Sequence, residues 1–346
     1  MIVIAGTRPE FIKLGPVVAE LRALGVTPTV IGTGQHIELL RGTPAEMDMV
    51  DATWLDLTSH GDVESWLELA TPALVRAMPD DAIVVVQGDT MSAMAGAQAA
   101  FYGKRTLCHV EAGVRSHNLQ EPYPEERLRK QIDALSTWMY APTSTAYANL
   151  VSEGRPANRI RLTGNTVVSA LARYSDANPV PIPDNTVLIT MHRREFLASR
   201  LCRATIAEIF TEAGKRPEIT YVWPVHPAVL PKMSDLPVPR NVEIGPPLSY
   251  LEATRLLASS LGVLTDSGGL QEEAATLGVP CAVLRNVTDR PESIEAGVAK
   301  LFPPTPDGVR DALGAFEGME RTPTTIYGHR DAAKIIATHL ATLEES

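Results

Sequence analysis

The sequence predicts an α/β protein with parallel sheets, and two features of the chain lead to this prediction. Short apolar runs alternate with helix-length segments along almost the whole chain, which is typical of strands joined by crossover helices. The apolar runs are continuous, and continuous runs indicate strands that helices cover on both faces. With 346 residues, and about 100–200 residues in a typical domain, two domains are expected.

The expected strands are apolar runs, and most of them end in glycine or in a polar group. They are 1–6, 27–34, 82–89, 106–113, 138–143, 160–165, 186–193, 219–226, 242–247, 261–269 and 280–286. The segments between them that carry helical patterns are 9–25, 92–103, 125–136, 203–215, 249–260 and 270–278. A last helix is expected over 331–345.

Two irregular stretches mark the expected domain division. The proline-rich run "RYSDANPVPIPDNT", residues 173–186, reads as a connector between domains. A second break falls at "RTPTTIYGHRD", residues 321–331. We therefore expect an N-terminal domain over 1–168 and a C-terminal nucleotide-binding domain over 169–328. The closing segment, 329–346, is expected to pack back on the first domain.

Composition excludes several classes of protein. The net charge of −10 argues against nucleic acid as a partner. Cys108, Cys202 and Cys281 are scattered and form no CxxC pair, which disfavours a zinc site and a disulfide framework and fits a reducing cytoplasm. The opening run "MIVIAG" has no basic segment before it, so no signal peptide is expected. No apolar stretch reaches membrane-crossing length, so we expect no membrane partner.

Chemically active groups follow nearly every expected strand. In open parallel sheets, ligands bind outside the carboxyl ends of the strands. Two sheets whose carboxyl edges face each other would bring these groups into one cleft. The groups are Gly6-Thr7-Arg8, Gly34-Gln35-His36, Gly88-Asp89-Thr90, Glu111-Ala112-Gly113, His192-Arg193-Arg194-Glu195, His226 and Asp266-Ser267-Gly268-Gly269.

Two strand-to-helix turns are suited to an anion. In "LTDSGGLQEEAATLG", Ser267 could cap a helix whose free N–H groups favour a diphosphate, although an ordinary tight turn explains the pattern equally well. In "GTRPEFIKL", Pro9 lies near the first helical position, with Arg8 just before it and Lys13 one turn beyond. Two cations there oppose the helix dipole, so either an anion binds or both cations are solvated.

Carboxylates and histidines at strand ends are the candidate acid–base groups. Asp89 and Glu111 follow buried runs, where partial desolvation suits proton transfer, although Asp89 could instead cap the next helix. Glu125 opens a helix together with a second glutamate, which the helix dipole favours in any case. His192 and His226 follow strands and could be packed core residues. There is no HxH or HExxH pattern, so no metal site is expected.

Taken in order, the motifs strongly resemble those of the non-hydrolysing UDP-N-acetylglucosamine 2-epimerases. The resemblance runs from residue 2 to about 299 and rests on an ordered set of motifs. They are "GTRPEFIKLGPVV", "GTGQH", "QGDT", "HVEAGVRSHN", "PYPEER", "APT", "TGNTV", "MHRRE", "PVHP", "LTDSGGLQEEAATLGVP" and "RNVTDRPE". The set implies a GT-B fold: two Rossmann-like domains with parallel sheets facing across a central cleft.

The resemblance also implies roles for individual residues. Asp89, Glu111 and Glu125 match the carboxylates implicated in proton transfer, and His192 joins them in the catalytic set. The matching substrate-binding residues are Arg8, Lys13, His36, Arg129, His226, Ser267, Gly268, Gly269, Glu273 and Arg290. Among these, Ser267 and the two glycines would hold phosphate and Glu273 the ribose, while the arginines of the charged 110–131 stretch would orient its carboxylates.

The implied reaction is reversible epimerisation at C2 of UDP-N-acetylglucosamine, by elimination and re-addition of UDP through a 2-acetamidoglucal. UDP-N-acetylglucosamine and UDP are the expected ligands, with no added cofactor, and a homodimer is expected. Three alternatives stay open: a hydrolysing 2-epimerase that releases N-acetylmannosamine and UDP, a GT-B glycosyltransferase, and a non-catalytic nucleotide-sugar binder. The chain departs from the family at Phe196, at Ala253, and by lacking an effector-site arginine in 61–74.

Overall fold

The structure, a computed structural model, describes residues 1–34, 48–49, 51–55, 57, 62–174 and 185–345. The chain divides into two compact units. One is formed by Met1–Tyr174 together with Tyr327–Ser346, and the other by Ser175–Ile326. Residue 168, where the sequence placed a domain boundary, lies within helix α7 (Thr166–Tyr174), which packs against α1 (Arg8–Ala23) in the first unit. Most of the expected connector lies outside the described residues.

The first unit contains a seven-stranded sheet in the order β3-β2-β1-β4-β5-β6-β7. Every neighbouring pair in it is parallel. Its strands are β1 (Ile2–Ala5), β2 (Thr29–Gly32), β3 (Thr53–Trp54), β4 (Ile83–Gln87), β5 (Thr106–Val110), β6 (Trp138–Ala141) and β7 (Ile160–Leu162).

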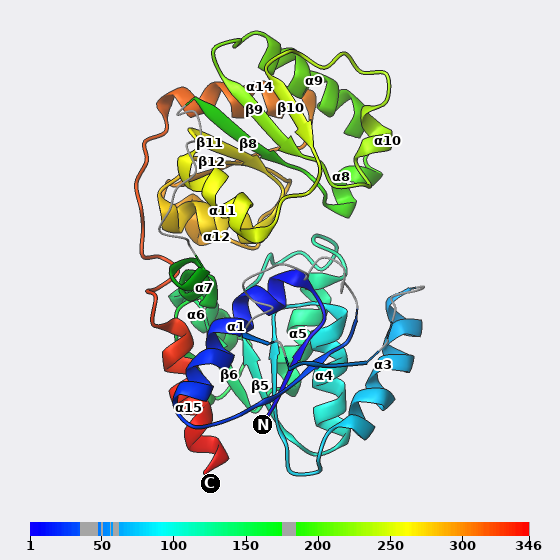
Figure 1. Ribbon diagram of the computed structural model, residues 1–346, viewed down its shortest axis with the longest axis vertical. Coiled ribbons are helices and arrows are strands. Elements are labelled where there is room, and N and C mark those ends of the chain that lie inside the picture. The colour runs from blue at the N-terminus through cyan, green and yellow to red at the C-terminus, as the bar shows by residue number, and fades with distance from the viewer. Residues whose placement is uncertain (35–47, 50, 56, 58–61, 175–184, 346) are drawn as a thin grey trace. The chain divides into compact units, whose positions relative to one another are not determined.

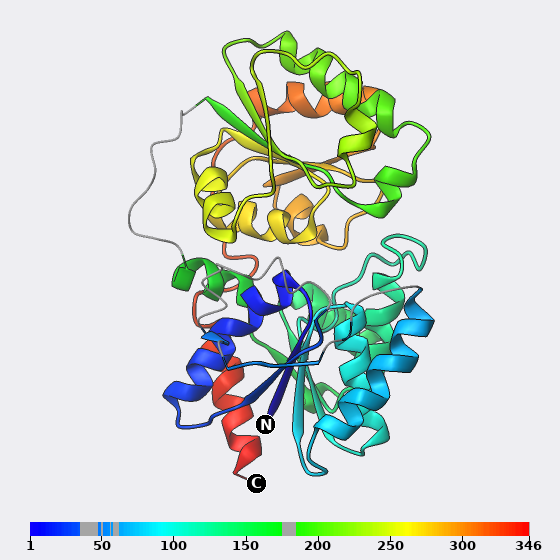
Figure 2. The same cartoon turned by 45° about the vertical axis from the view of Figure 1, so that its right-hand side comes forward.

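Helices cover both faces of the first sheet (Figures 1 and 2). On one face α1 packs with α7 and with α15 (Ala332–Glu344). On the other face α3 (Val63–Ala77), α4 (Met91–Tyr102) and α5 (Glu125–Leu135) bury Trp66, Leu74 and Ile132 against β1 and β4. The short helices α6 (Ser144–Ser152) and η2 (Ala157–Arg159) connect β6 to β7. Burial on both faces explains why β1 and β4 are apolar throughout.

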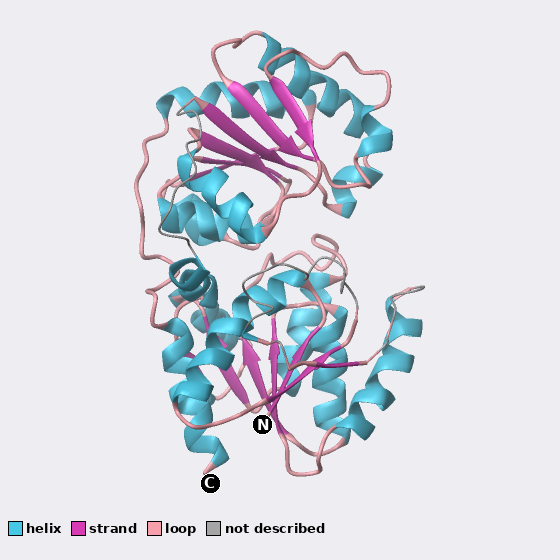
Figure 3. Cartoon of the chain, viewed as in Figure 1, coloured by secondary structure: helices cyan, strands magenta, loops and turns pink. Residues whose placement is uncertain are grey.

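The second unit contains a six-stranded sheet in the order β10-β9-β8-β11-β12-β13, again parallel at every pair. Its strands are β8 (Thr186–Thr190), β9 (Thr220–Pro224), β10 (Val242–Gly245), β11 (Gly262–Thr265), β12 (Cys281–Leu284) and β13 (Ala299–Phe302). Its helices are α8 (Arg194–Ala198), α9 (Cys202–Gly214), α10 (Leu230–Met233), α11 (Tyr250–Ser259), α12 (Gly268–Leu277), α13 (Pro291–Glu295), α14 (Pro306–Ala315) and η3 (Phe316–Gly318). Figure 3 shows helices on both faces of each sheet.

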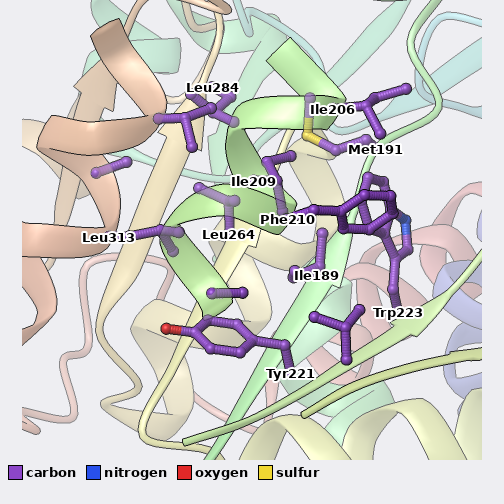
Figure 4. Packing of buried hydrophobic residues seen from close by; sticks show 14 of the residues in the cluster. Ile189, Met191, Ile206, Ile209, Phe210, Tyr221, Trp223, Leu264, Leu284 and Leu313 are labelled. Atoms are coloured by element: carbon purple, nitrogen blue, oxygen red, sulfur yellow. The ribbon is translucent and has the colours of Figure 1, made fainter. Parts of the chain in front are cut away.

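The core of the second unit follows from the alternation of side chains along each strand. In β8, Ile189 packs with Phe210 and Trp223 beneath α9 and α14, as Figure 4 shows for part of that cluster. Its neighbour Leu188 points to the opposite face, into the cluster that includes Leu257 of α11. Because successive side chains leave a strand on opposite faces, both must be apolar when helices cover both faces.

The structure confirms the predicted fold class of two Rossmann-like units with parallel sheets. It adds elements that the sequence analysis did not assign, among them α3, α14 and β13. In α3, Trp66, Ala70 and Leu74 are buried at spacings of four residues, but Pro72 lies inside the helix and obscures the pattern. In β13, only Ala299 is fully buried, so the continuous apolar run expected of an interior strand is missing at this edge.

Strand order defines where a ligand can approach each sheet. In the first sheet the chain moves outward from β1 in both directions, through β2 on one side and β4 on the other. The second sheet has the same switch between β8 and β11. Helices that follow such neighbouring strands lie on opposite faces, which leaves a crevice at the carboxyl ends of the strands. The turns after β1, β4, β8 and β11 therefore define the candidate site of each unit.

His339 holds the closing helix α15 on the first sheet. Its ring packs edge-on against Trp138 at 4.4 Å between centroids, and the Tyr140 hydroxyl lies 2.9 Å from His339 Nδ1. Burial lowers the pKa of His339 from 6.5 to about 4, and the charge of Arg161 adds to this effect. The neutral ring shares one hydrogen bond with the Tyr140 hydroxyl, accepting at a bare Nδ1 or donating from a protonated one.

We expect His339 to make the protein less stable as the pH falls. Between pH 6.5 and about 4 the unfolded chain binds a proton at this ring that the folded chain does not bind, so the free energy of unfolding decreases as the pH is lowered through this window. His339→Gln keeps an acceptor for Tyr140 but cannot titrate. Urea unfolding at pH 7 and pH 5 should show a smaller loss for the variant, whereas equal losses would contradict the assignment.

Candidate active site

Glu10 fixes the turn that follows β1. It lies in the first turn of α1, is fully buried, and accepts hydrogen bonds from the backbone N–H groups of Gly6 at 2.9 Å and Thr7 at 2.7 Å. Thr90, at the start of α4, donates its hydroxyl to Glu10 at 2.6 Å. Burial raises the pKa of Glu10, and these hydrogen bonds oppose the rise. The spacing of Thr7 and Glu10 is a capping-box signal that could have identified this residue from sequence.

Lys13 and Glu111 form a buried ion pair at the carboxyl edge of the first sheet. Lys13 Nζ lies 2.5 Å from Glu111 Oε2, and both side chains are 7% exposed. Gln87, the last residue of β4, donates to the same oxygen at 2.8 Å. Glu111 follows β5 directly and has a φ of 69°, a left-handed conformation that turns the chain sharply as it leaves the strand.

The structure corrects the expected position of Arg8 and refines the interpretation of Lys13. The sequence placed Arg8 just before the helix, but Arg8 is the first residue of α1. The conflict between Lys13 and the helix dipole is relieved by Glu111 within the protein, so Lys13 alone is not evidence for a bound anion. The ion pair instead sets the position of the Glu111 carboxylate beside the end of β4.

Asp89 is held by Arg129. The Arg129 guanidinium donates to the Asp89 carboxylate and to Glu126, the latter at 3.2 Å. The side chain of Arg129 is 4% exposed, whereas that of Asp89 is 26% exposed and reaches the surface of the site. The cap of α4 is Thr90, whose hydroxyl accepts from the backbone of Ala93, so Asp89 is not the helix cap that the sequence left possible.

The two glutamates that open α5 have different surroundings. Glu126 is 1% exposed and accepts from the backbone N–H groups of Ser116 at 2.9 Å and His117 at 3.2 Å. It therefore fastens the charged loop to the helix. Glu125 is half-buried at the first position of α5. Glu126 is therefore a structural residue of this loop, and the role of Glu125 in proton transfer stays a prediction from the sequence.

Much of the remaining charge in the 110–131 stretch is structural. Arg115 binds Asp133 and Glu153, each at 2.7 Å, and Lys130 binds Glu153 at 2.8 Å. Hydrogen bonding from Arg115 is the main reason why the pKa of Glu153 falls to about 2. The expectation that the arginines of this stretch orient the acid–base carboxylates fits Arg129, whereas Arg115 braces the loop against α5 and α6.

In the second unit, Asp266 organises the turn that follows β8. It accepts from the backbone N–H groups of His192 at 2.8 Å and Arg193 at 2.7 Å, and its other oxygen lies 3.2 Å from His192 Nδ1. Desolvation lowers the pKa of His192, although Asp266 opposes the shift. The His192 side chain is 42% exposed, so it is not a core residue. The His226 ring lies 6.1 Å away.

The start of α12 is the candidate anion site. Gly268 is its first residue, and a Cβ added there would lie 3.6 Å from the guanidinium of Arg193 and 3.7 Å from that of Arg290. A Cβ at Gly269 would meet open space. Ser267 occupies the cap position but makes no side-chain cap bond, contrary to one expectation. A helix start flanked by two guanidiniums is suited to a diphosphate.

Arg290 is aimed at this helix start by buried carboxylates. Its Nε donates to Glu272 of α12, and its Nη1 lies 3.0 Å from Asp289. Glu273, which was expected at the ribose, is 9% exposed on the same helix. The sequence analysis did not single out Gln87 or Asp289, and it named Asp266 only among the groups that follow a strand. Gln87 and Asp266 lie at strand ends, and this position could have marked them as candidate site residues. Their binding partners depend on the fold.

Other expectations for the site are limited by what the structure describes. His36 lies outside the described residues. Within the described ranges, no group of three or more His, Cys, Asp or Glu side chains is arranged to hold a metal ion. The described helices also include none with the length and apolarity needed to cross a membrane.

Comparison with known proteins decides the family. A family model described as UDP-N-acetylglucosamine 2-epimerase matches residues 19–341. The UDP-N-acetylglucosamine 2-epimerase of Neisseria meningitidis serogroup A is 37% identical over 327 residues, covering 87% of this chain and 86% of that protein. The chain belongs to the UDP-N-acetylglucosamine 2-epimerase family. The enzyme of the same name from Bacillus subtilis is 36% identical over 322 residues, covering 86% of this chain and 81% of that protein.

Solved structures of epimerase relatives match the whole chain. The UDP-GlcNAc 2-epimerase of Neisseria meningitidis, bound to UDP-GlcNAc, superposes with a TM-score of 0.89 at 33% identity and 99% coverage of both chains. The Methanocaldococcus jannaschii enzyme, in complex with UDP-GlcNAc and UDP, gives a TM-score of 0.87 at 29% identity, covering 99% of this chain and 98% of that one. A glycotransferase of kitacinnamycin, at 15% identity and a TM-score of 0.58, shares the fold alone.

We expect loss of the Lys13 ammonium to destabilise this epimerase homologue strongly. Lys13→Met would leave Glu111 buried without its cation, which costs about 3–5 kcal/mol. Lys130→Met is the matched control, because the side chains of Lys130 and Glu153 are 42% and 25% exposed, Glu153 keeps Arg115, and exposed pairs contribute less than about 1 kcal/mol. Urea unfolding measures both variants. Equal costs for the two would show that the Lys13–Glu111 pair is not held in a desolvated site.

Proposed function

We propose that the chain catalyses the reversible, non-hydrolysing epimerisation of UDP-N-acetylglucosamine to UDP-N-acetylmannosamine. The observation that carries this proposal is the pair of cation-bound carboxylates after two adjacent strands. Asp89 follows β4 and is held by Arg129, and Glu111 follows β5 and is held by Lys13. Family membership adds support, because relatives have been crystallised with UDP-GlcNAc and with UDP.

The chemistry requires more than one proton-transfer group. C2 of the sugar has no neighbouring carbonyl, so direct removal of its proton is too costly. In the elimination, the C1–O bond breaks and its electron pair leaves with UDP, while a carboxylate takes the C2 proton and a 2-acetamidoglucal forms. In the re-addition, an oxygen of the UDP β-phosphate attacks C1 while a carboxyl group delivers a proton to the opposite face of C2. This route needs a base, an acid and a stabilised leaving diphosphate.

In the first unit, Asp89, Glu111 and Glu125 are the proposed acid–base set. An ionised base must be available without being fully solvated. The Glu111 carboxylate, 7% exposed and bonded to Lys13 and Gln87, and the more accessible Asp89 carboxylate offer two different surroundings for the two proton transfers. Arg8, beside Glu10 at the start of α1, is proposed to contact the substrate diphosphate.

In the second unit, the start of α12 is the proposed diphosphate site. The first-turn N–H groups, the Ser267 hydroxyl, and the guanidiniums near Gly268 can stabilise the charge that develops on departing UDP. Glu273 is proposed at the ribose. His192, with Nδ1 turned to Asp266, presents its Nε2 away from that carboxylate, where it can contact the sugar or the diphosphate. The proposal needs no added cofactor.

The closest alternative is a hydrolase that performs the same elimination but lets water add to the intermediate. Incubation with UDP-N-acetylglucosamine, followed by proton and phosphorus NMR, separates the two. We expect a mixture of the two UDP-sugars that stops changing at equilibrium, with little free sugar. Accumulation of N-acetylmannosamine and UDP would favour the hydrolase, and a sugar-nucleotide that stays unchanged would favour a binder.

Variants of the three carboxylates test their roles. Asp89→Asn, Glu111→Gln and Glu125→Gln should each lower kcat by about 10²-fold or more, which is the usual effect of removing a general acid or base. The matched control is Asp80→Asn in the same unit, because the Asp80 side chain is fully exposed. Initial rates from UDP-N-acetylglucosamine measure the effect.

UDP binding by titration calorimetry completes this experiment. The three carboxylate variants should bind UDP as the unaltered protein does, whereas Ser267→Ala should bind it about 10- to 150-fold more weakly, since a hydrogen bond to a charged group contributes about 1.5–3 kcal/mol. Near-normal turnover by Glu111→Gln would assign that side chain a structural role. Unchanged UDP affinity in Ser267→Ala would remove Ser267 from the phosphate site.

A further inference from the structure

His109, on β5, is a buried histidine for which the proposed mechanism has no role. Its side chain is fully buried beneath the turns that carry Asp89 and Glu111. Nδ1 lies 2.6 Å from the carboxylate of Asp133 on α5, and Nε2 lies 2.8 Å from the carbonyl oxygen of Gly88 at the end of β4. Both ring nitrogens therefore lie within hydrogen-bonding distance of an oxygen.

The two partners limit which protons the ring can carry. A backbone carbonyl only accepts, so Nε2 must bear a hydrogen to bond Gly88. At Nδ1 two arrangements are possible. Either Nδ1 also bears a hydrogen and donates to an ionised Asp133, or Asp133 is protonated and donates to a bare Nδ1. The first arrangement makes His109 an imidazolium, and the second leaves it neutral.

The surroundings of Asp133 favour its ionised form. Its other oxygen accepts from the Gly113 backbone N–H at 3.1 Å and from the Arg115 guanidinium at 2.7 Å. A guanidinium does not give up its proton in proteins and bonds best to an anion.

The charge balance of this sheet edge accommodates another cation. The described side chains at the carboxyl edge and its bracing loop include more carboxylates than ammonium and guanidinium groups. The carboxylates are Glu10, Asp89, Glu111, Glu121, Glu125, Glu126, Asp133 and Glu153, and the cations are Arg8, Lys13, Arg115, Arg127, Arg129 and Lys130. A positive ring at His109 reduces this excess of negative charge.

His109 also links three segments that carry the acid–base groups. Through Gly88, which has a φ of 71°, it fixes the turn that leads directly to Asp89. Through Asp133, it holds the Gly113 N–H and so the turn that follows Glu111. Asp133 belongs to α5, the helix that carries Glu125 and Arg129. One ring therefore sets the separation of the three elements from which the carboxylates project.

We infer that His109 is a positioning residue: a buried imidazolium that donates through both ring nitrogens and holds the turns of Asp89 and Glu111 in the geometry needed for proton transfer. The positioning part of this inference rests on the proposed function. The protonation part rests on the hydrogen-bond geometry and on the charged groups around Asp133. The ring does not touch the substrate in this role. Its effect on the reaction passes through Gly88 and Asp133.

Nitrogen NMR of the unaltered protein tests the protonation directly. With ¹⁵N-labelled histidine, long-range ¹H–¹⁵N correlations distinguish an imidazolium, which has two similar protonated nitrogens, from a neutral ring, which has one protonated and one bare nitrogen with widely separated shifts. At neutral pH, His109 should give the first pattern. His339, whose Nδ1 lies 2.9 Å from the Tyr140 hydroxyl and whose pKa is lowered to about 4, should give the second. The spectrum of His109→Gln assigns the signal.

Kinetics of His109→Gln test the positioning. A glutamine amide can donate to Gly88 or to Asp133 but cannot span both as the ring does, so the turns lose one of their fixed points. We expect kcat to fall about 10- to 100-fold, the effect of an ångström-scale misplacement of reacting groups, while KM and UDP affinity stay within about twofold. The matched control is His339→Gln, a buried histidine of the same unit outside the site, which should keep kcat.

The two measurements separate failure of this inference from failure of the proposed function. A bare Nδ1 on His109 in the unaltered protein would overturn the assignment of this ring as an imidazolium, whatever reaction the protein catalyses. Near-normal kcat in a folded His109→Gln overturns the positioning role, as does an equal loss in His339→Gln. If the unaltered protein does not epimerise UDP-N-acetylglucosamine, the proposed function fails, and the NMR result still decides the protonation of the ring.

Discussion

The arrangement of the first unit depends on one electrostatic constraint: a carboxylate at the end of a buried strand must be matched by donors that the fold supplies. An ionised group in a desolvated site is costly unless it is paired and hydrogen-bonded. Glu111 has Lys13 and Gln87, Asp89 has Arg129, and Glu10 has the backbone of its own turn. Lys13, Gln87 and Arg129 come from three different elements, so Glu111 and Asp89 are paired only when the sheet and its helices are assembled.

The same constraint operates in the second unit, with a different outcome. There Asp266 satisfies the backbone of the turn after β8 and orients His192, while Arg290 is held by carboxylates behind α12. The buried anions of this unit therefore orient cations and an imidazole toward the strand ends. A nucleoside diphosphate needs such a positively charged surface, whereas proton transfer at carbon needs the carboxylates of the first unit. We therefore propose that the two units divide the work: the second binds the diphosphate, and the first carries out proton transfer.

Sequence alone predicted the class of each unit, because continuous apolar runs and strand-end polar groups are local patterns. It could not predict which partner each polar group would find. Lys13 was interpreted as a candidate for anion binding because its partner Glu111 is distant in the chain. Ser267 was interpreted as a possible helix cap, but whether a serine caps a helix depends on its side-chain rotamer, which the sequence does not reveal. His109 drew no attention inside an apolar strand, because only the pairing of β4 with β5 and the packing of α5 bring acceptors to both of its nitrogens.

The central claim is that the paired carboxylates remove and return a proton at C2 of a nucleotide sugar, and hydrogen exchange with solvent tests it most directly. The protein is incubated with UDP-N-acetylglucosamine in D₂O, and the recovered UDP-sugars are analysed by NMR. Epimerisation needs access to both faces of C2, so a carboxylate that has taken the proton exchanges it with solvent before another delivers one from the opposite side. The account predicts deuterium at C2 in both epimers. Recovery of UDP-N-acetylmannosamine that keeps its original C2 hydrogen would contradict it.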